Sequence, residues 1–301
     1  MKHNLKITAI LLLMFLLTQF IGLYVINHYS NNDLPLGLET PEVEEPREYN
    51  QLFVSIIFAF VIAISLLFLL THFKSEFLLR IWFLVVIIIG LVIALTSMIP
   101  FFKYSLLITL ILVVPLALVK VYKQDFIVHN ITELFIYPGI SAVFVPIFNV
   151  WTIIALLILI SIYDAWAVWH SGIMQKMAKY QINKLKVFSG FFIPYVSNRM
   201  RMKLKKLKKS ELKKKKIKVN VAILGGGDVI FPIITAGVFL RTNPFGLSGV
   251  QVLIPSLLII LGAALGLTYL FFFAEKKKFY PAMPFISAGI FLMMGLSWLI
   301  F

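Results

Sequence analysis

The sequence contains no cysteine among its 301 residues. This absence excludes disulfide bonds, thiolate metal sites and a cysteine nucleophile, and leaves no thiol for redox chemistry. The sequence also lacks a His-Glu-x-x-His pattern, which would mark the zinc site of a metalloprotease. We therefore expect a protein with no metal site and no cofactor.

Charged residues are scarce as well. They make up 14% of the sequence, whereas hydrophobic residues make up 60% and the mean hydropathy is +0.96. No large water-soluble domain fits this composition, so we expect an all-α, polytopic membrane protein. With about 20 apolar residues for each crossing, the sequence predicts nine transmembrane helices, at residues 5–26, 51–71, 78–99, 101–119, 127–148, 150–172, 219–240, 248–273 and 279–301.

Lysine and arginine are distributed unevenly among the loops that join these spans. Of the 28 basic residues, 25 fall on one side of the membrane and three, Arg47, Lys103 and Arg241, on the other. The positive-inside rule makes the side with 25 cytoplasmic. The N-terminus is therefore predicted to be cytoplasmic and Phe301 extracytoplasmic. The first span is longer than the core of a signal peptide, which predicts a retained anchor.

The spans and loops divide the chain into three predicted parts. Residues 1–172 form a six-span part, residues 173–218 a basic cytoplasmic loop and residues 219–301 a three-span part. Apolar residues among the lysines of the loop would suit a short helix on anionic lipid headgroups: Met200, Met202, Leu204 and Leu207. A flexible loop that only fixes orientation explains the same charge. No aromatic or base-reading pattern accompanies the lysines, so we expect no nucleic-acid partner.

Acidic residues number only 13, and their positions select two of them. Asp164 and Asp228 lie deep in apolar runs, whereas the others lie in the loop 27–50 or near span ends. A carboxylate in an apolar span is costly unless it faces a partner or water, which makes it a functional candidate. At the helical rise of 1.5 Å per residue, Asp164 lies about 12 Å and Asp228 about 13 Å from the same predicted boundary. Two spans are thus predicted to bring carboxylates to one level.

Both aspartates are predicted to lie on helix faces that allow close approach. The small or ring residues on these faces are Ser161, Ala167 and Ser171 beside Asp164, and Gly225, Pro232 and Thr235 beside Asp228. Pro232 has no N–H for the carbonyl of Asp228, which predicts a weak or kinked helix there. Backbone groups freed at membrane depth must face protein or a wet cavity, and hydrolysis needs such water.

Two carboxylates within hydrogen-bonding distance cannot both ionise readily, so they share a proton at moderate pH. The ionised group can take a proton from water as it attacks a peptide carbonyl, while the protonated group donates to the carbonyl oxygen. That is aspartic protease chemistry, and the proton belongs to the pair rather than to either residue. The same acids would serve a proton- or cation-coupled transporter, although the sequence shows neither inverted repeats nor further intramembrane cations.

Three short motifs add a family resemblance: Tyr163-Asp164, Gly225-Gly226-Gly227-Asp228 and Pro281-Ala282-Met283. In order and in span position they resemble the YD, GxGD and PAL motifs of the presenilin and signal peptide peptidase family. Met283 stands where that family usually has leucine, a residue of similar volume.

The resemblance implies an intramembrane aspartyl protease, similar to the microbial homologues, with Asp164 and Asp228 catalytic. It also implies transmembrane polypeptide substrates, in a lipid bilayer, at a substrate-binding set made of Tyr163, Gly225, Gly226, Gly227, Pro281, Ala282 and Met283. An oligomer is compatible with the sequence. In the fifth span, His129 and Glu133 are spaced by four residues, which predicts a local pair without a catalytic role.

Overall fold

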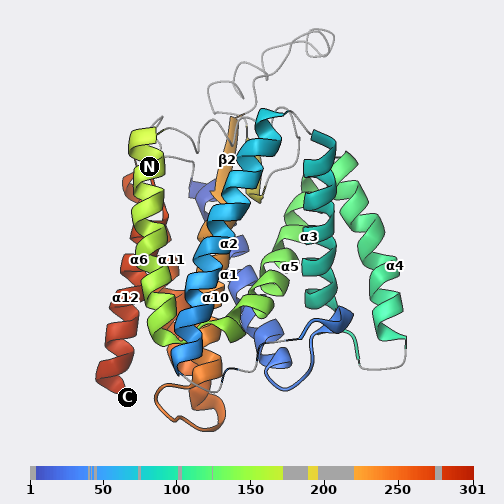
Figure 1. Ribbon diagram of the computed structural model, residues 1–301. Helices are drawn as coiled ribbons and strands as arrows, with labels where there is room; N and C mark the ends of the chain where they lie inside the picture. Colours follow the sequence, from blue (N-terminus) through green and yellow to red (C-terminus); the bar gives the residue numbers. More distant parts are fainter. Residues whose placement is uncertain are drawn as a thin grey trace.

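The computed structural model describes residues 5–39, 41, 43, 46–73, 76–100, 104–123, 125–171, 189–195, 220–274 and 280–301. Within them the chain forms nine α-helices and one two-stranded sheet (Figure 1). The helices are α1 (Leu5–Tyr29), α2 (Pro46–His72), α3 (Glu76–Thr96), α4 (Ser105–Leu118), α5 (Phe126–Phe144), α6 (Val150–Trp166), α10 (Gly226–Thr242), α11 (Leu253–Phe273) and α12 (Met283–Ile300). The predicted nine-helix architecture is confirmed.

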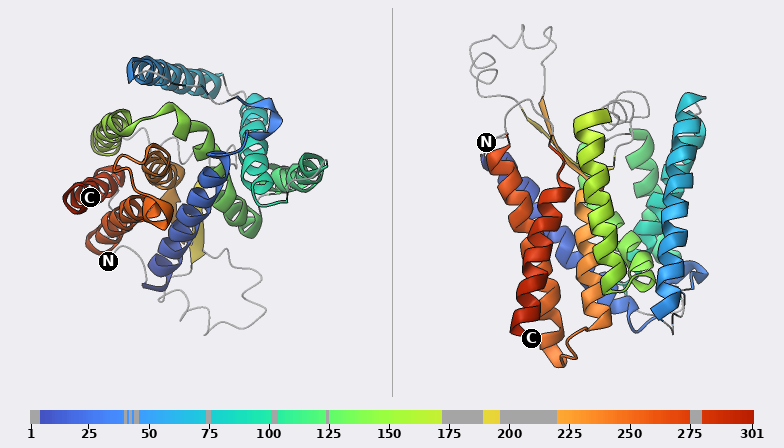
Figure 2. Two further views of the ribbon diagram at one scale, coloured as in Figure 1. Left: turned by 90° about the horizontal axis from the view of Figure 1, so that it is seen from below. Right: turned by 60° about the vertical axis from the view of Figure 1, so that its left-hand side comes forward.

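The helices have the length of a membrane crossing. Seven helical segments in the described part of the chain are long and apolar enough to span a bilayer, and α2 extends over 27 residues. Helix α10 has 17 residues, about 26 Å at the helical rise, and a strand precedes it directly. The two ends of the chain lie at opposite ends of the bundle (Figures 1 and 2). The chain is thus an integral, multi-pass membrane protein.

Helix α1 lies in the middle of the bundle, against α5, α10 and α11. Seen along the helices, α3 and α4 lie on one side of α1, and α11 and α12 on the other (Figure 2). The main apolar core follows α1 and α10 through the molecule, and a second buried cluster fills the space between α3, α4 and α5. Helices α11 and α12 approach closely at Gly262, Gly266 and Gly289, where backbone meets backbone. Glycines at a helix contact allow the two backbones to approach in this way.

The seventh helix begins later than the sequence predicted. Residues Asn220–Gly225 form strand β2, and α10 starts at Gly226 rather than near residue 219. Asp228 is therefore the third residue of its helix, so the depth calculated for it from a helical rise is wrong. The helix continues through Pro232 to Thr242, and the irregular backbone lies at its start instead.

Strand β2 pairs with β1 (Gly190–Tyr195), which falls inside the region predicted to be a loop. The pairing is antiparallel, with Gly190 opposite Gly225 and Tyr195 opposite Asn220. Side chains of a strand alternate between its faces. Along β2, Ala222 and Leu224 are accordingly buried, whereas Val221 and Ile223 are exposed. The sheet extends from the start of α10 towards one end of the bundle (Figure 1). The helix proposed from Met200 to Leu207 lies outside the described residues.

Candidate active site

Asp164 lies near the end of α6, and its side chain is 4% exposed. Its Oδ2 atom accepts a hydrogen bond of 3.0 Å from the backbone N–H of Met283, and the Ala282 backbone provides a second bond. Met283 is the first residue of α12. The N–H groups of a first helical turn have no partner within the helix and form the positive end of its dipole. Helix α12 therefore binds this carboxylate with its N-terminus.

The other oxygen of Asp164 is different. Oδ1 is buried and has no hydrogen-bond partner among the described residues. A buried carboxylate oxygen is stable only with a donor, which can be water or a protonated carboxyl group. The carboxyl group of Asp164 is thus fixed on one side and available for chemistry on the other.

Asp228 occupies the first turn of α10 and is half-buried. Its carboxylate lies at the positive end of that helix, and the Gly225 backbone hydrogen-bonds it. A side chain on Gly225 would begin 3.1 Å from Asp228 Oδ2, so glycine leaves the carboxylate its place. Each of the two aspartates therefore lies at the N-terminus of a helix, Asp164 at α12 and Asp228 at α10.

The structure brings these two aspartates together. Helix α6 packs against both α10 and α12, and the Asp228 carboxyl interacts electrostatically with that of Asp164. Ser161, one turn before Asp164, donates its hydroxyl to Ser287 of α12 over 2.9 Å. The small-residue face of α6 thus contacts α12. The site consists of two carboxylates from different spans, with one oxygen that lacks a donor among the residues that the structure describes.

The other residues predicted at the site have different surroundings. Pro281 and Met283 are buried and Ala282 is half-buried, so in this structure the segment supports Asp164 through its backbone. The Tyr163 side chain is 46% exposed and lies away from the interior that contains Asp164.

The glycines before Asp228 are not equivalent. Gly226 is buried, and a methyl group on it would lie 2.6 Å from Ser189 Oγ and 2.8 Å from Tyr137 Oη. Gly227 is exposed, and a methyl group there would meet nothing closer than Phe231 at 3.7 Å. Gly226 is therefore required for packing, whereas Gly227 leaves open space beside Asp228.

A buried charged cluster near the site was missed by sequence analysis. Lys120, in the π-helical turn η2 (Val119–Lys123), forms an ion pair of 2.6 Å with Glu133 of α5, and the two residues are 4% and 2% exposed. Lys120 is thus wrongly counted among the cytoplasmic loop residues, and it is a further intramembrane cation of the kind the sequence did not reveal. The predicted His129–Glu133 pair forms at 3.7 Å. The four-residue spacing found that pair, but nothing local indicated Lys120.

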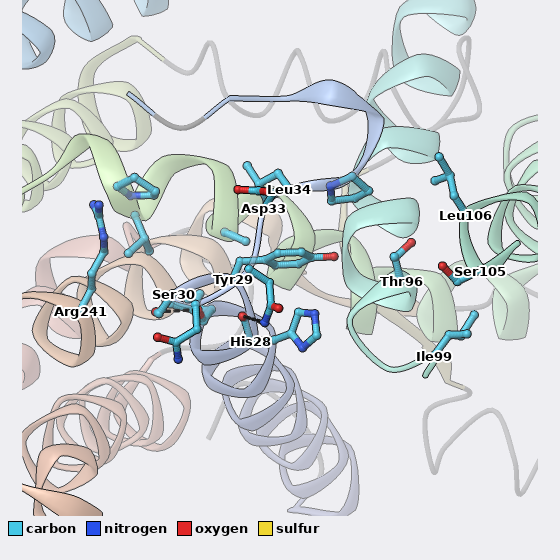
Figure 3. A pocket seen from close by; sticks show the side chains of 17 residues that line it. His28, Tyr29, Ser30, Asp33, Leu34, Thr96, Ile99, Ser105, Leu106 and Arg241 are labelled. Atoms are coloured by element: carbon cyan, nitrogen blue, oxygen red, sulfur yellow. Dashed lines mark hydrogen bonds between the residues drawn. The ribbon is translucent and has the colours of Figure 1, made fainter. Parts of the chain in front are cut away.

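One cavity lies far from the aspartates. It has a volume of about 720 Å³ and is lined at the opposite end of the bundle by residues that include His28, Asp33 and Arg241 (Figure 3). Arg241 is in the last turn of α10, whereas Asp228 is in the first. Within the described residues, no group of three or more histidine and acidic side chains could bind a metal ion.

The sequence matches the family described as signal-peptide peptidase and presenilin aspartyl protease over residues 12–300. Solved structures of a presenilin family intramembrane aspartate protease, in C222 and P2 space groups, are similar to the chain. The first has a TM-score of 0.62 at 18% identity and covers 98% of this chain and 99% of its own. The second has a TM-score of 0.58 at 20% identity and covers 97% of each. At these identities the likeness shows the fold alone. A search of curated proteins found no match.

Proposed function

Because the chain belongs to the family of signal-peptide peptidases and presenilin aspartyl proteases, it is an intramembrane aspartic endopeptidase, and we propose that Asp164 and Asp228 are its catalytic pair. The observation that carries the assignment is the convergence of these carboxyl groups at two helix N-termini, with Asp164 Oδ1 free of hydrogen-bond partners in the described ranges of the chain. Neither the family nor the fold supports the alternative of a proton- or cation-coupled transporter. The buried Lys120 removes one argument against transport, namely that the sequence shows no further intramembrane cation. It does not by itself provide a path for a proton or cation across the membrane.

The geometry supports a general acid and base mechanism. Two helix N-termini stabilise negative charge at the site, while the proximity of the two carboxyls disfavours a second charge, so the pair retains one proton. The ionised carboxylate takes a proton from water, whose oxygen bonds to the peptide carbonyl carbon, and the protonated carboxyl donates to the carbonyl oxygen. One hydroxyl of the tetrahedral intermediate then returns its proton to the carboxylate that donated, the C–N bond breaks, and the amine leaves with the proton that the other carboxyl took from water.

The substrates are transmembrane polypeptides in a lipid bilayer. We assign their contacts to the open side of the site, at Gly227 and the half-buried Ala282, with Pro281 and Met283 shaping the backbone there. Tyr163, which is exposed, would contact a substrate only from outside the buried pair. Both carboxylates come from one chain, so an oligomer, which the sequence allows, is not needed to complete the pair.

The catalytic assignment is tested with Asp164→Asn, Asp228→Asn and the double variant, on a single-span test peptide with purified protein. Each single substitution is expected to lower kcat about 10²–10⁴-fold, and the double variant to be no worse, because residues acting as a unit are non-additive. Asp33→Asn, at the opposite end of the bundle (Figure 3), is the matched control and retains activity. Substantial cleavage by a folded single variant would refute the pair.

For the orientation we propose a cytoplasmic N-terminus, an extracytoplasmic Phe301, and a basic loop at 173–218 between the six-span and three-span parts. Removing Lys120 from the cytoplasmic count of 25 leaves 24 basic residues against three, so the charge asymmetry persists. Cysteines placed at Ser30 and Ser210 test it, since the native chain has none. A membrane-impermeant thiol reagent on intact cells should label position 30 and spare position 210, and the reverse result would invert the topology.

The basic loop also has a proposed partner. Its sixteen lysines and arginines favour contact with anionic lipid headgroups on the cytoplasmic leaflet. The test compares the wild type with a variant in which the loop lysines are replaced by glutamine. Both proteins are sedimented with vesicles of neutral lipid, with and without phosphatidylserine, and only the wild type should bind more strongly when phosphatidylserine is present. Equal binding of wild type and variant to both vesicle types would leave the loop with a topological role only.

A further inference from the structure

The Lys120–Glu133 pair is a feature that the catalytic mechanism does not use. Both side chains are almost fully buried, in helical segments long and apolar enough to span a bilayer, Ser105–Lys123 and Phe126–Ile147. Glu133 is seven residues into α5, about 10 Å along that helix. A buried ion pair is weak evidence for stability, because apolar residues of similar volume often serve as well. Ionisable residues inside a membrane protein instead mark a functional role by default. The question is what this pair positions.

The ammonium group of Lys120 organises the start of α5. Besides Glu133, it donates to Thr132 Oγ1 at 3.1 Å and to the His129 carbonyl at 3.3 Å, and it lies 3.4 Å from His129 Nδ1. An ammonium group has donors only, so Nδ1 faces it as an acceptor and the ring proton is on Nε2. Nε2 lies 2.8 Å from the carbonyl oxygen of Gly190 and donates to it. The cluster thus fixes the first residue of β1.

A second contact from α5 reinforces the first. The Asn130 side-chain amide donates to the Phe192 carbonyl at 2.9 Å, and its oxygen accepts the Phe192 N–H at 3.1 Å. Strand β1 is thereby bound to α5 on one edge and to β2 on the other, with Gly190 opposite Gly225. Gly225 ends β2, and Asp228 follows three residues later. The chain of contacts therefore runs from Lys120 to the turn that carries Asp228.

Tyr137 provides a second route to the same turn. It lies one helical turn after Glu133, its ring stacks edge-on against Phe191, and its hydroxyl fits against Gly226. A cavity of about 190 Å³ lies here, and the residues that line it include Lys120, Glu133, Tyr137, Gly226 and Gly227. The Oε2 atom of Glu133 is buried there without a hydrogen-bond partner in the described part of the chain. The charged cluster and the glycine turn thus share one cavity wall.

From these contacts we propose that Lys120, His129 and Glu133 are positioning residues, which hold β1 at Gly190 and so fix the Gly225–Asp228 turn relative to Asp164. The proposal rests on the catalytic assignment of the two aspartates. None of the three residues is assigned a contact with the reacting atoms. Their role is to keep the Asp228 carboxyl in the geometry that the acid and base cycle requires.

The test compares kcat, KM and Tm of variants on the same single-span peptide. His129→Leu removes the donor to Gly190 without removing a buried charge, and is expected to lower kcat at least about tenfold with KM nearly unchanged. His129→Gln, whose amide can donate to the same carbonyl, should recover most of that loss. His28→Leu, in the cavity at the opposite end of the bundle (Figure 3), is the matched control. Wild-type kcat in His129→Leu would overturn the proposal.

The ion pair itself is tested with Lys120→Met and with the double variant Lys120→Met, Glu133→Leu. The single variant leaves a buried carboxylate unpaired and should lower Tm by at least about 5 °C. The double variant should recover Tm but not kcat, because apolar residues replace the packing without binding His129. Recovery of both would make the pair purely structural and refute the proposal. If Lys120→Met does not fold, His129→Leu decides.

Asp164→Asn, measured alongside, separates the two levels of inference. If it retains activity, the catalytic assignment fails and the positioning role fails with it. If it is inactive while the His129 and Lys120 variants match the wild type, only the positioning role fails.

Discussion

Substitution of Gly226 by alanine tests how tightly the turn before Asp228 is packed. The added methyl group would lie 2.6 Å from Ser189 Oγ, 2.8 Å from Tyr137 Oη and 3.0 Å from Tyr137 Cε1. The Ser189 hydroxyl can rotate away, but the Tyr137 ring is 3% exposed and has no room to move. The methyl group must therefore displace either the ring or the turn.

Overpacking of this kind costs about 1–3 kcal/mol. Gly226 is the first residue of α10, where alanine recovers little of the roughly 0.5–1 kcal/mol that it gains over glycine inside a helix. We therefore expect Gly226→Ala to lower Tm by about 3–10 °C. A displaced turn also moves Asp228, and a misplacement of a fraction of an ångström should lower kcat roughly tenfold.

Gly227→Ala is the matched control, because it makes the same chemical change one residue away in open space. Its Tm should equal or slightly exceed that of the wild type. Thermal unfolding in detergent and cleavage of a quenched single-span peptide give the two readouts. Adding Tyr137→Phe to Gly226→Ala removes the oxygen at 2.8 Å and should recover part of both losses. A Gly226→Ala protein with wild-type Tm and kcat would show that the turn can accommodate a methyl group at this position, and would refute the tight packing.

Three further substitutions or conditions test other features. Gly262→Val should separate α11 from α12 at Gly289 and destabilise the protein by about 1–3 kcal/mol. Gly295→Val is the control, because nothing lies within 4 Å of a side chain added there. Equal melting curves for the two variants would contradict the close packing. Pro281→Leu should lower kcat roughly tenfold without unfolding, because proline fixes the backbone before the N–H groups that bind Asp164, and unchanged cleavage would remove this segment from the site. Activity should decline at alkaline pH, where the shared proton is lost, and at acid pH, where the base is protonated; a pH–rate profile that keeps rising above neutrality would exclude a shared proton.

The nine-helix frame was predictable because apolar runs of about 20 residues leave few alternatives in a membrane. The sheet was not, because β2 pairs with β1 across about 30 residues of chain, and a short apolar run such as Asn220–Gly225 fits a helix or a strand equally well. The three glycines at its end were the available signal. Glycines indicate an irregular backbone there, but not that β1 is the strand with which β2 pairs.

The site shows the same division between local and distant information. Asp164 and Asp228 stand out in the sequence because acids are rare in apolar runs. The binding of Asp164 by the Met283 N–H and the packing of Tyr137 on Gly226 depend on residues about 90–120 positions away, which no local pattern encodes. Lys120 was assigned to a loop because a lysine near a span end usually reaches water. Only the fold shows that Glu133 and His129 meet it first.

The hydrogen bond from Met283 to Asp164 also has a consequence for biosynthesis. Helix α12 is synthesised after every other helix that contacts the pair, and Met283 follows Asp228 by 55 residues, roughly 3–11 s of translation. Until α12 has inserted, the Asp164 carboxylate lacks the helix N-terminus that binds it. A nascent chain therefore contains both acids for several seconds without a working site. During that time its own spans, and those of a neighbour at the same translocon, are not exposed to an assembled protease.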